Sequence, residues 1–163
     1  PDLVMVPIRG NVETRLEKIH TEGLDAVILS EAGLVRLGIQ TEHKEILDPS
    51  IFFPAPGQGV ISIQTRVSDN EVRSMAQSIS DPIQTKISHA ELEFMKALDF
   101  DCTIPLGLFI DTASLDETGE VIINAFSADN TGGNQKRVSL ATPIETIHES
   151  VLQCAEKVRQ END

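Results

Sequence analysis

The chain has 163 residues and a formal net charge of −13, with 26 acidic residues against 13 Lys and Arg. Nucleic acids and anionic membranes both require clustered positive charge, so this balance argues against either as a partner. Hydrophobic residues make up 40% of the chain, and no run of them approaches the ~20 residues of a membrane span. Two isolated cysteines, outside any CxxC or metal-ligand spacing, fit a reducing, cytoplasmic setting.

The first 80 residues alternate strand-like and helix-like segments. Apolar runs predict buried strands at 2–8, 24–29 and 60–67. Helical periodicity, with Gly23 and Gly38 as helix ends, predicts helices at 12–22, 31–37 and 70–79. This alternation of strands and helices favours an α/β arrangement of parallel strands and crossover helices.

The pattern changes after Ser80, where we expect a domain boundary. A helix is predicted from Pro82 to about Leu98, with its acidic residues, Glu91 among them, on a solvated face. Three antiparallel strands are predicted at 103–112, 121–128 and 136–141, joined by the turn segments LDETGE and DNTGGNQ. The last helix, 144–160, has an apolar stripe of Ile147, Val151, Ala155 and Val158, with Cys154 packed beside it. These elements predict a small α+β domain with a three-stranded antiparallel sheet.

Arginines recur where predicted strands give way to helices. Arg9 and Arg15 flank such a junction in RGNVETR. A helix N-terminus favours anions, and guanidinium groups form bidentate hydrogen bonds to carboxylates. Arg36, in AGLVRLG, follows the next predicted strand. Because open α/β sheets bind ligands at the carboxyl ends of their strands, we expect Arg36 to face the same cleft. Taken singly, each arginine can equally be a solvated surface residue.

Two loops complete the set of candidate residues. In the PAPGQG loop, 54–59, the glycines allow close approach of the backbone to a ligand, and the Gln58 amide offers both a donor and an acceptor. The segment around Cys102 places a thiol between a predicted helix and strand, where it can be exposed. Taken singly, the first is a rigid interdomain loop, and most lone cysteines are inert and buried.

In this order and spacing, the segments RGNVxTR, AGLxRLG, PAPGQG and Cys-x-x-Pro resemble the porphobilinogen deaminase (hydroxymethylbilane synthase) family along essentially the whole chain. The resemblance implies a transferase of tetrapyrrole biosynthesis, the route to heme and chlorophyll. Such an enzyme joins four porphobilinogen molecules into hydroxymethylbilane and releases ammonia, on a covalently bound dipyrromethane primer. The resemblance assigns the primer attachment to Cys102, and binding of the primer and of the growing polypyrrole chain to Arg9, Arg15, Arg36, Gln58 and Gly59.

The family has three domains, of which the first two resemble periplasmic binding proteins. The resemblance therefore assigns residues 1–55 to the second half of the central α/β domain, 56–80 to a segment returning to an N-terminal domain, and 81–163 to a C-terminal α+β domain that attaches the cofactor. The family's catalytic aspartate belongs to the N-terminal domain, which this sequence does not contain. We therefore assign no catalytic residue and no metal ligand, and expect the chain alone to be inactive. A full-length member is expected to be monomeric, whereas the chain alone is prone to self-association.

Two positions depart from the family pattern. Phe100-Asp101 precedes Cys102 where two glycines are usual, and Leu92 stands where the preceding helix usually carries an arginine. These departures suggest one alternative, a homologue that kept the fold but lost cofactor attachment. A second alternative stays open on the arginines alone. It is a non-catalytic module, similar to periplasmic binding proteins, that binds a small anionic ligand through Arg9, Arg15 and Arg36.

Overall fold

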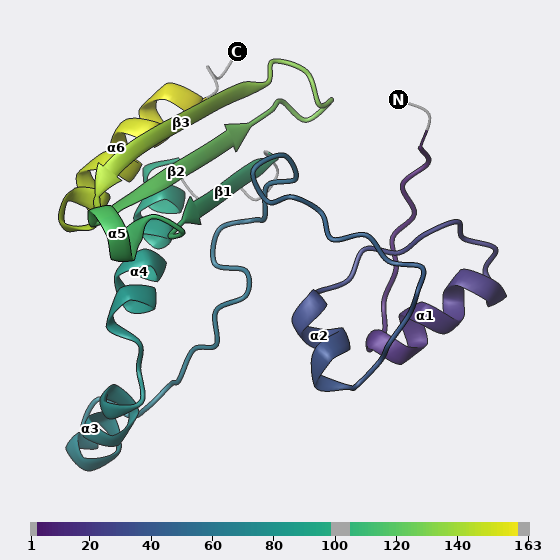
Figure 1. Cartoon of the computed structure of the whole chain (residues 1–163), viewed down its shortest axis with the longest axis horizontal. Helices are drawn as coiled ribbons and strands as arrows, with labels where there is room; N and C mark the ends of the chain where they lie inside the picture. The colour runs from purple at the N-terminus through teal and green to yellow at the C-terminus, as the bar shows by residue number, and fades with distance from the viewer. Residues whose placement is uncertain (1–2, 99–104, 160–163) are drawn as a thin grey trace. The chain divides into compact units, whose positions relative to one another are not determined.

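The computed structural model describes residues 3–98 and 105–159 and divides the chain into two compact units (Figure 1). Unit 1 comprises Pro1–Leu47 and unit 2 comprises Asp48–Asp163. Cys102 lies outside the described residues. Within them, no helix combines the length and the apolar character that a membrane crossing requires.

Unit 1 contains two helices, α1 (Val12–Thr21) and α2 (Glu31–Arg36), at the predicted places. The side chain of Asn11 caps α1, because its Oδ1 accepts a hydrogen bond from the amide of Thr14 at 2.8 Å. Gly38 follows α2 with a φ of +63°, a left-handed conformation that glycine adopts without steric cost. Local capping therefore defines both helices, as their sequence signals indicate.

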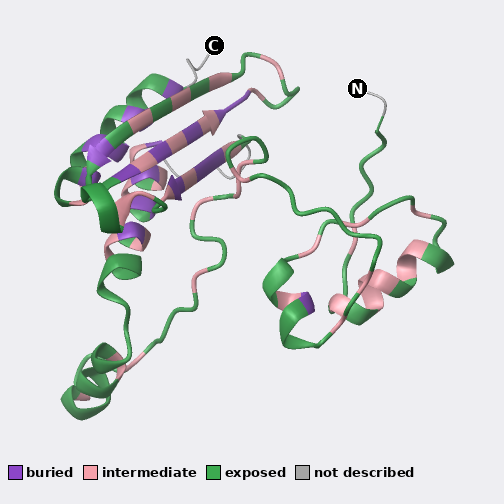
Figure 2. Cartoon of the chain, in the orientation of Figure 1, coloured by how far each residue is buried: buried purple, intermediate pink, exposed green. Residues whose placement is uncertain are grey.

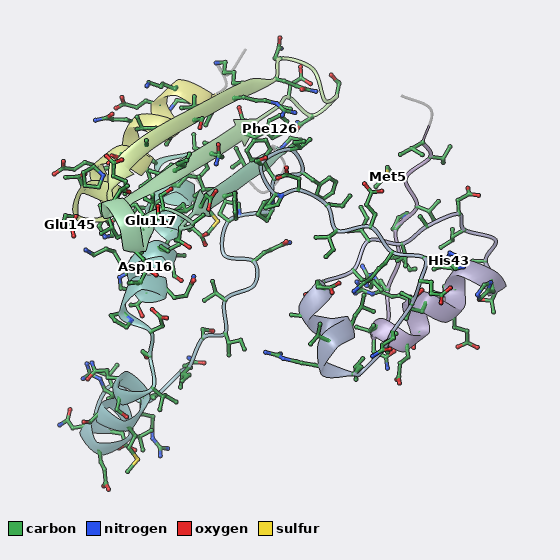
Figure 3. The ribbon with its side chains drawn as sticks, viewed as in Figure 1. Met5, His43, Asp116, Glu117, Phe126 and Glu145 are labelled. Atoms are coloured by element: carbon green, nitrogen blue, oxygen red, sulfur yellow. The ribbon has the colours of Figure 1, made fainter. Side chains whose placement is uncertain are left out.

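Strands are absent from three segments for which the sequence predicts them. The described residues of segments 2–8, 24–29 and 60–67 form neither strand nor helix. Their apolar side chains are exposed or half-buried. Met5, labelled in Figure 3, has an exposed fraction of 78%. A strand is stabilised by hydrogen bonds to a neighbouring strand, and the described residues offer these segments none. The strand prediction is therefore wrong for these segments, and the parallel α/β sheet expected of residues 1–80 is not confirmed.

Unit 2 is built around a three-stranded antiparallel sheet of order β1-β2-β3, as the sequence predicts. The strands are β1 (Leu106–Asp111), β2 (Glu120–Ser127) and β3 (Lys136–Pro143). The helices are α3 (Asn70–Ser78), α4 (Pro82–Ala97), the short α5 (Leu115–Thr118), the 3-10 turn η1 (Ile144–Thr146) and α6 (Ile147–Val158). The sequence predicts all of these except α5, which occupies a segment expected to be a turn.

The hydrophobic core lies between this sheet and the helices α4 and α6, and Figure 2 shows buried residues on all of them. The predicted apolar stripe of α6 is fully buried, and Cys154 beside it is buried as well, as expected. Phe94 is the largest fully buried side chain and extends from α4 into this core. By contrast, the apolar side chains of α3 that were expected to point inward are exposed: Val72, Met75 and Ile79.

Removal of the Phe94 ring should destabilise unit 2 strongly. Phe94→Ala leaves a cavity in a closed core and should lower the free energy of unfolding by about 3–5 kcal/mol. The matched control is Leu92→Ala on the same helix, where 43% of the side chain is exposed and the loss should stay below about 1 kcal/mol. Urea unfolding followed by circular dichroism measures both. Equal losses would mean that α4 packs with another face.

Candidate functional site

The junction before α1 carries two of the predicted arginines. Gly10 has a φ of +130°, and a Cβ at this position would lie 2.9 Å from Cγ2 of Thr14, so the junction requires glycine. Arg15, in the second turn of α1, bends back and donates from Nε to the Gly10 carbonyl at 2.8 Å. Arg9 precedes the turn and is exposed. Two guanidinium groups therefore extend from the N-terminal end of α1, which carries partial positive charge.

The third arginine lies on the neighbouring helix of unit 1. Arg36 is the last residue of α2 and is exposed. Its helix packs on the start of α1 through Gly33, because a Cβ at Gly33 would lie 3.2 Å from Cγ2 of Val12. Within residues 3–98 and 105–159, the guanidinium groups of Arg9 and Arg36 form no hydrogen bond and no ion pair, so both can donate to an external anion. The two arginine motifs thus belong to one compact unit and to helices in contact.

In unit 2, the PAPGQG loop is attached at its beginning to the sheet. The amide of Leu108 in β1 donates to the carbonyl of Pro54 at 3.0 Å. Phe53 packs directly on Gly107, where a Cβ would come within 2.3 Å of the Cβ of Phe53, so this position of β1 admits only glycine. Gln58 and Gly59 at the other end of the loop are exposed. The loop therefore presents its predicted binding residues to solvent from a fixed base.

A buried carboxylate supports the middle of this loop. Oε2 of Glu91, on α4, accepts a hydrogen bond from the amide of Gly57 at 2.9 Å. Only 9% of Glu91 is exposed, and this burial raises the pKa of its carboxyl, while the Gly57 bond opposes the shift. The prediction of a solvated face for Glu91 is therefore wrong. Glu91 lies four residues after Ile87 and three before Phe94, which are both buried. This helical spacing puts the three side chains on one face and could have predicted that Glu91 points inward.

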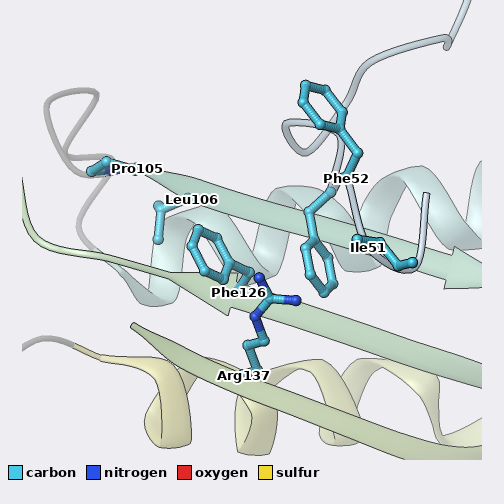
Figure 4. Close-up of a pocket in the computed structure, with 7 residues that line it drawn as sticks. Ile51, Phe52, Pro105, Leu106, Phe126 and Arg137 are labelled. Atoms are coloured by element: carbon cyan, nitrogen blue, oxygen red, sulfur yellow. The ribbon is translucent and has the colours of Figure 1, made fainter. Parts of the chain in front are cut away.

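A second contact secures the chain just before the loop. The rings of Phe53 and Phe126 stack with centroids 5.5 Å apart, and the guanidinium group of Arg137 lies over both, 5.3 and 5.2 Å from their centroids (Figure 4). Beside this stack is a pocket of about 290 Å³. Its lining comprises Ile51, Phe52, Phe53, Pro105, Leu106, Phe126 and Arg137. The aromatic stack holds the segment before the PAPGQG loop on the sheet.

The candidate residues are thus distributed over both parts of the chain. Arg9, Arg15 and Arg36 lie in unit 1, whereas Gln58 and Gly59 lie in unit 2. Cys102 lies outside the described residues, so its role in cofactor attachment stays a prediction. Among the described residues, no group of His, Cys, Asp and Glu has the geometry to hold a metal ion.

Comparisons with known proteins agree with these motifs. Residues 1–74 match the family model described as "Porphobilinogen deaminase, dipyromethane cofactor binding domain". Porphobilinogen deaminase of Limosilactobacillus reuteri is 44% identical over 108 residues, which cover 66% of the chain and 35% of that protein. The enzymes of that name from Listeria monocytogenes (42% over 117 residues, 70% and 38% covered) and Sorangium cellulosum (36% over 137 residues, 84% and 44% covered) are also similar.

The matched part of the chain is thus similar to a class of cofactor-binding domain, the one that binds dipyrromethane. The chain as a whole is similar to part of the porphobilinogen deaminases. It spans between about a third and somewhat under half of the length of the relatives that it matches.

The buried carboxylate of Glu91 should make stability depend on pH. Because its pKa is raised above the ordinary value of 4.5, the native state holds this proton more tightly than the unfolded chain does. The ionised group therefore costs stability above its native pKa, and this cost disappears as the pH falls toward 4.5. Glu91→Gln should gain stability relative to the unsubstituted chain at about pH 8 and lose this gain near pH 4.5.

Urea unfolding at the two pH values measures this difference. The control is Glu93→Gln on the same helix, whose carboxylate is 42% exposed. A gain from Glu91→Gln that grows toward low pH would contradict the assignment.

Proposed function

We propose that this chain is part of a porphobilinogen deaminase, or hydroxymethylbilane synthase. The complete enzyme would polymerise four porphobilinogen molecules into hydroxymethylbilane, release ammonia, and build the product on a covalently bound dipyrromethane. The observation that carries the proposal is the arginine-flanked junction of α1, within the segment that matches the family's cofactor-binding domain. The catalytic acid of the reaction is assigned to a part of the enzyme outside this sequence.

The chemistry of the arginines fits this ligand. Each pyrrole ring of the cofactor and product carries an acetate and a propionate, so the growing chain is a polyanion. Guanidinium groups bind carboxylates through paired hydrogen bonds and stay charged at every physiological pH. The guanidinium groups of Arg9 and Arg36 have no acceptor among the described residues, and that of Arg15 is held at the junction by its bond to Gly10. Arg9 and Arg15, at the N-terminal end of α1, therefore suit carboxylates of one polyanionic chain.

We also propose that the PAPGQG loop binds the ligand. The side-chain amide of Gln58 is exposed and offers a donor and an acceptor to a pyrrole ring and its carboxylates. A Cβ at Gly59 would meet no atom within 4 Å, so open space lies beside the backbone there. We assign Gln58 and Gly59 to ligand binding on these grounds.

Cys102 is our candidate for the covalent attachment of dipyrromethane. The bound cofactor supplies the terminal pyrrole to which each new unit is joined. Cys154, the other cysteine, is fully buried, and this burial raises the pKa of its thiol, which makes the reactive thiolate scarce. The choice between the two cysteines therefore favours Cys102.

We further propose the domain assignment that the family suggests. Residues 1–55 would complete a central α/β domain similar to periplasmic binding proteins, 56–80 would return to an N-terminal domain, and 81–163 would form the domain that attaches the cofactor. The first and second segments contain the apolar runs that lack strand neighbours. Strands from the rest of the enzyme would supply the backbone hydrogen bonds that these runs need to form a sheet. The complete enzyme would be a monomer, and the two isolated cysteines of this chain are in keeping with a cytoplasmic setting.

Loss of an arginine at the junction before α1 should strongly lower the activity of the complete enzyme. Arg9→Ala or Arg15→Ala removes a charge-assisted contact worth about 1.5–3 kcal/mol, so kcat/KM for porphobilinogen should fall roughly ten- to hundredfold. The control is Arg73→Ala, because Arg73 lies on α3 and donates to the carbonyl of Val67. Steady-state product formation measures all three variants. Similar small effects at the three positions would place the ligand elsewhere.

Covalent attachment should depend on one cysteine. The intact mass of the complete enzyme should exceed the mass of its polypeptide by one dipyrromethane, and Cys102→Ser should abolish this increment, because a hydroxyl is a far poorer nucleophile than a thiolate. Cys154→Ser should retain it. An unmodified thiol in active enzyme, or an increment that survives Cys102→Ser, would refute the attachment site.

A further inference from the structure

Glu91 has an unusual environment for a carboxylate. It lies on the inward face of α4, next to Ala90 and one turn before Phe94, which are both fully buried. Burial of a charged group costs free energy unless hydrogen bonds compensate. The partner that the structure gives its carboxylate is the backbone amide of Gly57, from a loop distant in sequence. The bond therefore ties the PAPGQG loop to the core helix.

This bond is the last side-chain attachment before the exposed end of the loop. Before it, the loop is fixed by the Leu108–Pro54 backbone bond and by Phe53. Gly57 has a φ of +80°, a conformation that costs most other residues steric strain. Within the described residues, only the bond from the Gln58 amide to the Ala55 carbonyl holds the next residue, and that bond is internal to the loop. The orientation of the exposed end thus depends on where Gly57 is held.

We propose that Glu91 is a positioning residue that holds Gly57, and through it presents Gln58 and Gly59 to the substrate. The inference rests on the proposed function, in which Gln58 and Gly59 bind the ligand. Glu91 does not touch the substrate in this role. It acts through one hydrogen bond, accepted on α4 and donated by the loop.

Two substitutions separate this role from simple packing. Glu91→Gln keeps an oxygen that can accept from Gly57, whereas Glu91→Leu keeps much of the volume but removes the acceptor. If acceptance of the Gly57 amide matters, glutamine rescues function and leucine does not. If only the filling of space matters, leucine is tolerated as well as glutamine. Glu93→Leu is the matched control, because the Glu93 carboxylate pairs with His148 at 2.7 Å instead of with the loop.

The test measures two quantities in the complete enzyme. Amide hydrogen exchange of the loop should accelerate at Gly57 by about tenfold or more in Glu91→Leu, while global unfolding stays cooperative, since one hydrogen bond to a charged acceptor is worth about 1.5–3 kcal/mol. KM for porphobilinogen should rise about fivefold to tenfold with kcat at saturation nearly unchanged, because a misplaced loop weakens binding and leaves the chemical step intact. Glu91→Gln should stay within about twofold of the unsubstituted enzyme on both measures.

Three results would overturn the proposal. One is an unchanged KM in Glu91→Leu despite faster exchange at Gly57, which would make the bond purely structural. The second is a Glu91→Gln variant as impaired as Glu91→Leu, and the third is an equal rise of KM in Glu93→Leu. Absence of turnover in the unsubstituted enzyme would instead refute the proposed function, and the role of Glu91 would fall with it.

Discussion

The packing of α4 against α6, which itself lies on the antiparallel sheet, is the contact on which unit 2 depends. Phe94 and its buried neighbours close the core from this helix, and Glu91 extends from the same inward face to the PAPGQG loop. One helix face thus stabilises the domain and fixes the loop. A change that shifts α4 would move the loop as well, so stability and ligand contact are coupled in this part of the chain.

Unit 1 is stabilised differently, because it has little hydrophobic core of its own. Leu34 is its one buried hydrophobic residue within the described part of the chain, and its helices are defined mainly by caps and by a glycine contact. Its arginine junction nevertheless forms, because the bonds that shape it are local: the Asn11 cap, the Gly10 turn and the Arg15 back-contact. A local motif can therefore present a charged site where long-range packing is sparse.

Local signals were sufficient to predict most elements. Asn11 and Asp81 cap their helices as their residue types suggest, and turn residues separated the three strands correctly. The strand predictions for segments 2–8, 24–29 and 60–67 were wrong. An apolar run forms a buried strand only when a neighbouring strand is present to pair with it. The burial of Glu91 was not predicted, because its charge was given more weight than its position on the inward face of the helix. The arginines and the PAPGQG loop could be singled out by motif, whereas the Glu91–Gly57 contact spans a separation that no local pattern encodes.

The edges of the sheet bear on how the protein behaves in concentrated solution. An open edge strand offers unpaired backbone groups to other chains, and natural proteins cover or charge such edges. In β1 the Leu108 amide is already occupied by Pro54, and β3 begins with Lys136 and Arg137 and ends at Pro143. The apolar segments 3–8 and 60–67 have no comparable protection. Aggregation of the isolated chain should therefore begin at these segments and leave the sheet intact.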